Sequence, residues 1–566
     1  MLKLMEKWYL PLAFFAVCVL KWPGAWLSYS QGKWLAVHFA GLAVTVLALA
    51  RFPKVPRLKL GETVFLFGLI LASFSHTIYF SPRGFEFTIL DRWSFLFLAL
   101  GAWYGFRSGK LAWKDFWWPL AAALAVVSAI GLGQMWQAGF TGVMPYLTVG
   151  STFGHTNNTA QFMGMALLLW WMIPRPRVPA WLMPLLSGIA LTYFFFLRGR
   201  STLIGFALGL VILVILRYRR EGKAFFQRRG ILVAALLAAF LFGGFQLARG
   251  KSFADLIQFQ LLSEKSSMVQ WRADVWRQTL EMIRAKPWGV GADRFTFEFI
   301  PFHARGVTLT ENGIADTPHN EILRYLAEDG IPLATLYFLA FCYLIFRWIR
   351  REEDWFRFLP LFAFMAVEIV AQYAFNNPLP SIVLALLVGY MAACVWREEL
   401  AIPQRPWVRG LTCAVLLLQL FFATKVVIAR SFEHAETLEK ATLSCRAVPR
   451  NWHSCLTQTR IELDRNDLRA ARESAQDILF NDPWNFSAMR YLSIVAFRQG
   501  DRLEGCFYLW KYDHLFFDRS SIHDKLALNC PPKWLDYFRR KNPENYLPRY
   551  EEYQRKQKGS SLRFWE

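Results

Sequence analysis

Arginine and histidine side chains gather in residues 263–330, the longest polar stretch of an otherwise apolar chain. Arg272, Arg277 and Arg284 come first, and His319 follows just before the next apolar block. A guanidinium group binds phosphate oxygens through two parallel hydrogen bonds, and a neutral imidazole accepts a proton from a hydroxyl group. Together they could transfer a group from a diphosphate to a hydroxyl, because the arginines would stabilise the charge of the leaving diphosphate.

The arginine-rich segment WRADVWRQTLEMIRAKPWGVG (271–291) has the spacing of an amphipathic helix. Arg272 and Trp276 are four positions apart and therefore share one face of that helix. The pattern leaves open which arginines bind a substrate and which are solvated surface groups; Arg272 and Arg277 are the candidates. The glycines of 287–291 indicate a turn, and a lone Gly-x-Gly is no evidence for nucleotide binding.

His319 lies in DTPHNEILRYLAEDGIP (316–332), at the start of a predicted helix that leads into an apolar block. Near a membrane surface this imidazole can be neutral at pH 7 and act as a general base. The alternative is a histidine that only caps the helix. Asn320 is a neighbouring candidate for substrate binding, and Glu321 and Glu328 either orient the imidazole ring or lie on the helix surface.

Two earlier turns carry further candidates. In GSTFGHTNNTAQFMG (150–164), Asn157 and Asn158 could hydrogen-bond a sugar or a phosphate, and the alternative is an amide-rich helix cap. In LRGRSTLIG, Arg198 and Arg200 lie between two apolar blocks, where an arginine is costly and points to a function unless it reaches the interface. Arg200 also precedes a helix start, whose dipole favours an anion.

The sequence lacks the usual motifs of metal and nucleotide chemistry. We find no Asp-x-Asp pair in the predicted extracytoplasmic loops, no HExxH, no GxSxG and no Walker loop. We therefore expect a reaction that needs neither a metal nor another cofactor.

The elements that would position these residues are membrane spans. The chain has 566 residues, of which 55% are hydrophobic and 17% aromatic, and its apolar blocks have the length that crosses roughly 30 Å of hydrocarbon. We predict an all-α polytopic membrane protein with about 12–13 transmembrane helices. The predicted spans are 9–22, 34–50, 61–79, 93–106, 117–138, 158–173, 180–197, 201–217, 231–248, 331–348, 357–375, 380–396 and 409–429.

The charges of the loops set the predicted orientation. With the amino terminus in the cytoplasm, the basic loops at 51–59, 107–114, 174–177, 217–229, 347–357 and 396–409 all fall on the cytoplasmic side. This bias accounts for most of the net charge of +22, and we expect no nucleic-acid partner. The long loop 249–330 then lies outside the cytoplasm, as does the chain beyond residue 430.

The predicted membrane domain, residues 1–429, is followed by a soluble helical domain, residues 430–566. Part of it resembles a tetratricopeptide-like helical pair, with turns at 482–483 and 500–501, and such a module binds a protein partner or packs on its own chain. Its four cysteines, Cys445, Cys455, Cys506 and Cys530, can form two disulfides in an oxidising compartment, and their pairing stays open.

TFGHTNNTA, GRSTLIG, WRADVWRQTLEMIRAKPWGVG and PHNEILRYLAEDGIP occur here in an order that resembles the O-antigen ligase and polymerase superfamily, which includes the bacterial protein O-oligosaccharyltransferases. The resemblance spans about 150–335. It implies a metal-independent membrane glycosyltransferase of the C-type architecture, with a long periplasmic loop. Such an enzyme moves a glycan from undecaprenyl diphosphate to lipid A core or to a protein, on the periplasmic face of the bacterial inner membrane.

The resemblance also implies roles for individual residues. His319 matches the family's base, and Arg272 and Arg200 match its diphosphate-binding arginines. Gly199 stands where the family more often has serine, which leaves Arg198 as a competitor of Arg200. The alternative within the class is a polysaccharide polymerase, whose acceptor is a second lipid-linked glycan. A transporter of lipid-linked glycans and a scaffold without catalytic activity are the alternatives from other classes.

Overall fold

The structure of the protein is a computed structural model that describes part of the chain. The described residues are 2–20, 28–51, 54–80, 86–137, 151–153, 156–174, 176–179, 181–197, 199–221, 266–292, 294–299, 302, 315, 317–371, 378–401, 406–432, 435–448, 452–481, 485–516 and 529–541. The predicted span at 231–248 lies outside them.

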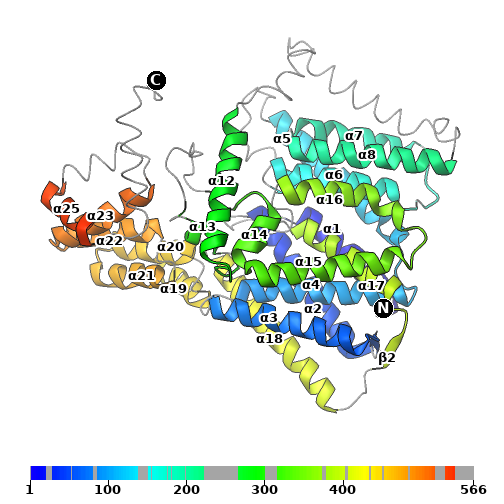
Figure 1. Cartoon of the computed structure of the whole chain (residues 1–566), viewed down its shortest axis with the longest axis horizontal. Coiled ribbons are helices and arrows are strands. Elements are labelled where there is room, and N and C mark those ends of the chain that lie inside the picture. Colours follow the sequence, from blue (N-terminus) through cyan, green and yellow to red (C-terminus); the bar gives the residue numbers. More distant parts are fainter. Residues whose placement is uncertain are drawn as a thin grey trace, which may run out of the picture.

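Helices make up almost all of the described structure (Figure 1). The first part contains α1 (Leu2–Val19), α2 (Ser28–Arg51), α3 (Leu60–Phe80), α4 (Glu86–Arg107), η1 (Trp113–Phe116), α5 (Trp117–Gln137), η2 (Ser151–Phe153), α6 (Thr156–Met172), α7 (Leu182–Phe196) and α8 (Arg200–Glu221). After the long loop come α15 (Gly330–Ile349), η5 (Trp355–Phe358), α16 (Leu359–Ala371), α17 (Pro378–Val395) and α18 (Pro406–Ser431). Every predicted span within the described residues coincides with one of these helices.

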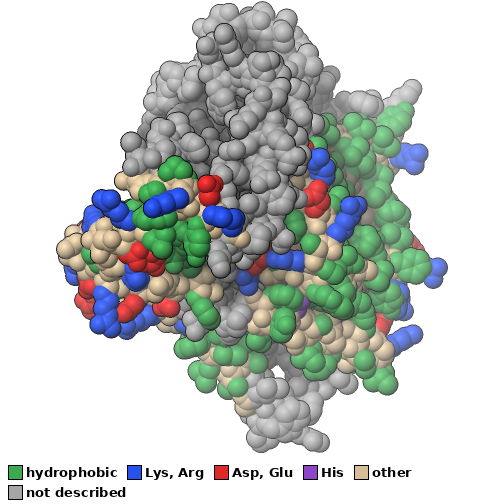
Figure 2. All heavy atoms as spheres, turned by 60° about the vertical axis from the view of Figure 1, so that its left-hand side comes forward, with side chains coloured by type: hydrophobic (Ala, Val, Ile, Leu, Met, Phe, Trp, Pro, Cys, Tyr) green, Lys and Arg blue, Asp and Glu red, His purple; other side chains and the backbone are tan. Residues whose placement is uncertain are grey.

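These helices form the bundle of a membrane protein. Among the described residues, 4 helical segments are long and apolar enough to cross a membrane, namely Leu60–Phe80, Trp113–Met135, Ser201–Arg220 and Gly330–Ile349. Shorter apolar helices, such as Pro380–Val395, accompany them. Figure 2 shows a broad apolar surface on the bundle, with lysine and arginine side chains at its right-hand edge. A helix satisfies its own backbone hydrogen bonds, which is why such segments can sit in hydrocarbon.

Small residues let the helices approach one another closely. A Cβ atom on Gly389 of α17 would lie 2.5 Å from the carbonyl oxygen of Ala99 in α4. On the other side of the bundle, a Cβ on Gly209 of α8 would lie 2.7 Å from the carbonyl oxygen of Pro360 in α16. Close contact of this kind is how membrane helices gain packing energy, because lipid tails remove the hydrophobic driving force between helices.

Two short strands accompany the helices of the predicted all-α fold. Strand β1 (Lys54–Pro56) pairs with the antiparallel strand β2 (Glu399–Ala401), and Arg107 donates to the backbone carbonyl of Arg397 beside them at 2.6 and 3.0 Å. The helix-period pattern of the flanking blocks gave no sign of two three-residue strands so far apart in the chain. The pair joins two loops that the charge pattern had assigned to the same side of the membrane.

At the end of the bundle away from the β1–β2 strand pair, one helix runs across the others. There α12 (Ser266–Ala285) runs crosswise to the bundle helices, next to the short helices α13 (Phe295–Phe299) and α14 (Glu321–Glu328) (Figure 1). We call this the α12 end. The inner face of α12 packs into a small separate core, which comprises Val275, Met282, Ile283, Val290, Phe295, Phe299, Ala315 and Ala327.

The last part of the chain is a stack of helices on the α12 side of the bundle (Figure 1). It contains α19 (Leu438–Ala447), α20 (Trp452–Asp464), α21 (Leu468–Asn481), α22 (Phe486–Arg498), α23 (Arg502–Phe516) and α25 (Pro532–Lys541), and consecutive helices from α19 to α23 pack together. Disulfides join Cys445 to Cys455 and Cys506 to Cys530. Gly500, with φ of 83°, forms the predicted turn between α22 and α23. The tetratricopeptide likeness stays a prediction, and the turn at 482–483 lies outside the described residues.

Candidate functional site

Two side chains of α12 attach this helix to the rest of the α12 end. Arg272 Nη1 donates to the carbonyl oxygen of Ala371, the last residue of α16, at 3.1 Å. Trp276 Nε1 donates to the carbonyl oxygen of Pro318 at 2.8 Å. The two side chains lie on the face that their four-residue spacing predicts. The helix therefore connects the end of a bundle helix to the residue directly before His319.

His319 is held in an unusual backbone conformation. Its φ of 49° lies in the left-handed region, which few residues with a Cβ adopt, although histidine is among those that do so more often. Asn320, and not His319, caps α14, because the Asn320 side chain accepts a hydrogen bond from the backbone N–H of Leu323 at 3.1 Å. The side chain of His319 is half-buried. The capping alternative for His319 is therefore excluded, and the role of Asn320 in substrate binding stays a prediction.

The acidic residues of α14 pair with an arginine of the same helix. Arg324 Nη2 lies 2.5 Å from Glu321 Oε1, and Arg324 Nη1 lies 3.9 Å from Glu328 Oε2. All three side chains are buried. Glu321 and Glu328 thus do not lie on the helix surface, because each forms part of a buried charge network that stiffens the helix behind His319.

The glycine-rich turn after α12 serves a packing role. Val290 N–H and Gly291 N–H donate to the carbonyl oxygens of Ala327 and Glu328 at 3.0 and 2.9 Å. A Cβ on Gly289, where φ is 85°, would lie 2.4 Å from the Glu328 carbonyl oxygen. The glycines allow two backbones to touch at the junction of α14 and α15, so their N–H groups face protein and do not form a phosphate-binding loop.

An ion pair fixes this junction to the bundle. Arg92 of α4 lies 2.6 Å from Asp329, and its guanidinium also donates to the carbonyl oxygen of Ser73 at 2.9 Å. His76 Nε2 lies 2.8 Å from the carbonyl oxygen of Trp288 and hydrogen-bonds it. The side chain of Asp329 is only 2% exposed. The segment that follows His319 is therefore held against α3 and α4. Arg92 and Asp329, which form the ion pair, are 237 positions apart in the chain.

The two earlier turns also meet at this end. Asn157 and Asn158 lie, half-buried, in the first turn of α6, and α8 begins at Arg200. A Cβ on Gly199 would lie 2.9 Å from Ala160 Cβ, so the turn before α8 touches the second turn of α6. This contact gives a reason for glycine at a position where the family more often has serine. Arg198 and the side chain of Arg200 lie outside the described residues.

Arg277 occupies a different position from Arg272. Its side chain is 67% exposed and pairs with Asp274 at 3.2 Å. At about 100° per residue, Arg277 points roughly 140° around the helix axis from Arg272, so it lies off the face that carries Arg272 and Trp276. The structure thus separates two arginines that the sequence alone could not rank, and a substrate contact of Arg277 stays a prediction.

A buried acid that sequence reasoning missed lies in α16. Glu368 is 1% exposed, and its Oε2 accepts a hydrogen bond from Gln161 Nε2 of α6 at 2.6 Å. Burial lowers the pKa of the nearby Arg272 guanidinium, and the negative charge of Glu368 opposes that effect. A single carboxylate inside the apolar block 357–375 was the available signal, because ionisable groups at membrane depth are rare and functional by default.

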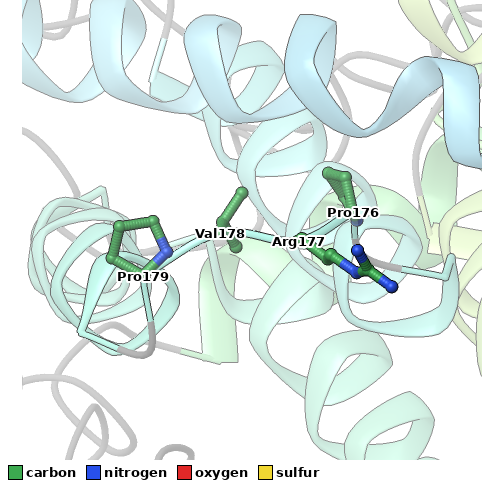
Figure 3. Close-up of a pocket in the computed structure, with 4 residues that line it drawn as sticks. All are labelled: Pro176, Arg177, Val178 and Pro179. Carbon is green, nitrogen blue, oxygen red and sulfur yellow. The ribbon is translucent and has the colours of Figure 1, made fainter.

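Other features of the described structure do not form a second site. One open pocket is lined by Pro176, Arg177, Val178 and Pro179, which follow one another along the link between α6 and α7, at the end of α6 away from Asn157 (Figure 3). Among the described residues there is no group of three or more His, Cys, Asp or Glu side chains that could hold a metal ion. Metal independence itself stays a prediction.

The central part of the chain is similar to a known family. Residues 185–338 match the family model described as O-antigen ligase. The match covers most of α7 and all of α8, α12, α14 and the His319 segment, and it confirms the predicted resemblance to the O-antigen ligase and polymerase superfamily. A search of curated proteins finds no match to the chain.

Proposed function

We propose that this chain, which matches the O-antigen ligase family model over residues 185–338, is a glycosyltransferase. It would move a glycan from an undecaprenyl diphosphate carrier to a hydroxyl group of lipid A core or of a protein. The observation that carries the proposal is the double attachment of α12, by Arg272 to Ala371 and by Trp276 to Pro318. These contacts bring a guanidinium and an imidazole to the same end of a membrane bundle.

In the proposed reaction His319 takes the proton of the acceptor hydroxyl. The acceptor oxygen bonds to the anomeric carbon of the glycan, and the bond between that carbon and the diphosphate oxygen breaks. The leaving diphosphate gains a negative charge, which Arg272 and Arg200, or Arg198 in its place, stabilise through paired hydrogen bonds. This division of labour needs no metal ion.

The remaining candidates take supporting roles in this proposal. Asn157 and Asn158 hydrogen-bond the sugar or the phosphates at the start of α6. Asn320 holds the helix start behind His319 and contacts the acceptor with the rest of its amide. Arg277, on the exposed face of α12, contacts the outer part of the glycan.

We place the reaction on the periplasmic face of a bacterial inner membrane. The basic loops around β1 and β2 meet at the end of the bundle opposite α12, as the positive-inside rule requires if the α12 end is periplasmic. The two disulfides in the C-terminal helices favour an oxidising compartment for the same side. The helical domain would then be available to a protein partner or an acceptor.

The proposal is tested by reconstituting the full chain in lipid vesicles with a lipid-linked glycan and candidate acceptors. Transfer to lipid A core or to a protein supports a ligase, whereas longer lipid-linked chains identify the polymerase alternative. His319→Ala should reduce transfer by at least about 10²–10⁴-fold, the usual contribution of a general base. Arg469→Ala, which alters an arginine that is 89% exposed in the C-terminal helices, is the matched control and should transfer normally.

If a folded, membrane-inserted His319→Ala variant transfers glycan at the wild-type rate, His319 is not the general base. Addition of EDTA should leave the wild-type rate unchanged. A requirement for magnesium would contradict the proposal that the arginines alone stabilise the charge of the leaving diphosphate.

A further inference from the structure

Glu368 is a charged group in a place where charge is costly. It lies in α16, an apolar helix of the bundle, and its side chain is almost wholly buried. A carboxylate at membrane depth destabilises the protein by several kcal/mol unless partners compensate for it. Gln161 supplies one partner at 2.6 Å through Oε2, but Oε1 accepts no hydrogen bond from the described residues. Packing alone therefore gives no reason for an acid at this position.

Three parts of the candidate site converge on this carboxylate. Gln161 lies one turn after Asn157 on α6, and the hydroxyl of Thr202, two residues after Arg200 in the first turn of α8, lies close to the carboxylate. Arg272 of α12 bonds the carbonyl oxygen of Ala371, one turn after Glu368 on α16. Glu368 thus lies on the helix that packs against α6 and α8 and whose last residue bonds to α12.

The charges of Glu368 and Arg272 act on each other. Burial lowers the pKa of the Arg272 guanidinium, and the negative charge of Glu368 opposes that effect. Arg272 also interacts with the carbonyl end of α16, which carries a partial negative charge. Within the described residues, Ala371 provides its one hydrogen-bond acceptor, through Nη1, and in this proposal the other guanidinium nitrogen donates to an anion. A direct contact between Glu368 and a diphosphate would instead be repulsive.

We propose that Glu368 is a positioning residue, which holds the Arg272 guanidinium at the end of α16 so that its fork meets the carrier diphosphate. The proposal rests on the proposed function only for the identity of the anion. The carboxylate of Glu368, three residues before Ala371 on α16, attracts the Arg272 guanidinium. The Ala371 carbonyl oxygen holds one nitrogen of that guanidinium by a hydrogen bond. Gln161 in turn fixes the carboxylate and links it to the helix that begins with Asn157 and Asn158.

The test compares the binding of undecaprenyl diphosphate to the purified full chain and to Glu368→Gln, followed by tryptophan fluorescence. The glutamine keeps one acceptor oxygen for Gln161, removes the charge and replaces the second oxygen with an NH2 group. We expect about tenfold weaker binding, a midpoint of thermal unfolding that does not fall, and partial recovery of binding in Glu368→Asp. Glu353→Gln, at an exposed position near the opposite end of the bundle, is the matched control and should bind like the wild type.

A double variant shows whether Glu368 acts through Arg272. Glu368→Gln should weaken binding no further in a chain that already carries Arg272→Lys, because residues that act as one unit give non-additive effects. Additive losses, or wild-type affinity in Glu368→Gln, would overturn the proposal. If the wild type binds the diphosphate but transfers no glycan, the proposed function fails while the positioning role stands; absence of binding by the wild type overturns both.

Discussion

Two arginines at the α12 end of the bundle show how the same side chain can serve structure or chemistry. Arg92 has protein partners at both terminal nitrogens, since it pairs with Asp329 at 2.6 Å and donates to the Ser73 backbone. Arg272 has one backbone carbonyl, at 3.1 Å, and a carboxylate nearby. An arginine held by several protein groups fixes the structure, whereas one that has a single hydrogen-bond acceptor among the described residues could also bind an anionic substrate. Changes to each should therefore affect different measurements.

The largest expected effect is a loss of stability when Arg92, the structural arginine, loses its partner Asp329. Asp329→Ala leaves the charge of Arg92 buried without its partner, which costs about 3–5 kcal/mol in comparable buried pairs. We expect a clear fall in the midpoint of thermal unfolding in detergent. Normal stability of Asp329→Ala would show that the Arg92 pair is not the anchor of the His319 segment. Asp536→Ala, in the C-terminal helices, serves as the control.

Arg272→Lys should show the opposite behaviour. Lysine keeps the charge but cannot form paired hydrogen bonds with a phosphate, and each charge-assisted hydrogen bond contributes about 1.5–3 kcal/mol. We expect kcat/KM for glycan transfer to fall by roughly 100-fold while the unfolding midpoint stays unchanged. Arg277→Lys is the informative companion, because an exposed contact with the outer glycan should cost far less. Equal losses in the two variants would remove the distinction between the two faces of α12.

A smaller effect is expected from the second attachment of α12. Trp276→Phe removes the hydrogen bond to Pro318, and an ordinary hydrogen bond contributes about 1 kcal/mol, so transfer should fall roughly fivefold. Trp288→Phe changes an exposed indole on the neighbouring turn and should have no effect. An equal loss of transfer in Trp288→Phe and Trp276→Phe would mean that the size of the indole ring, and not the hydrogen bond to Pro318, is responsible.

The smallest effect is expected from removing the C-terminal helices. A chain that ends after Ser431 keeps α18 and the whole α12 end, so basal transfer to a small acceptor should stay within roughly a factor of two. Transfer to the natural acceptor is measured in the same vesicles, and a selective loss there would identify the helical domain as an acceptor or partner module. Complete inactivity of a folded truncated chain would place the domain within the catalytic unit.

The sequence predicted the local parts of this end better than their connections. Apolar blocks located the bundle helices, and four-residue spacing put Arg272 and Trp276 on one face, because both signals depend on neighbours along a helix. The pairing of Arg92 with Asp329 joins residues 237 positions apart and leaves no local pattern. The Asn320 cap was missed because two adjacent polar residues precede the helix, and only the backbone angles distinguish the capping one. Glu368 was missed because it interrupts its apolar block only once.

The close packing of Gly389 against Ala99 has a consequence for how the protein is made. The α4 helix is synthesised 290 residues before its partner in α17, which at about 5–20 residues per second is roughly 15–60 s of translation. During that time the face of α4 that later meets α17 has no protein partner, and the membrane insertion machinery or lipid must cover it. Slow codons or a chaperone acting before α17 emerges would therefore influence the yield of the whole protein, including residues that never touch Gly389.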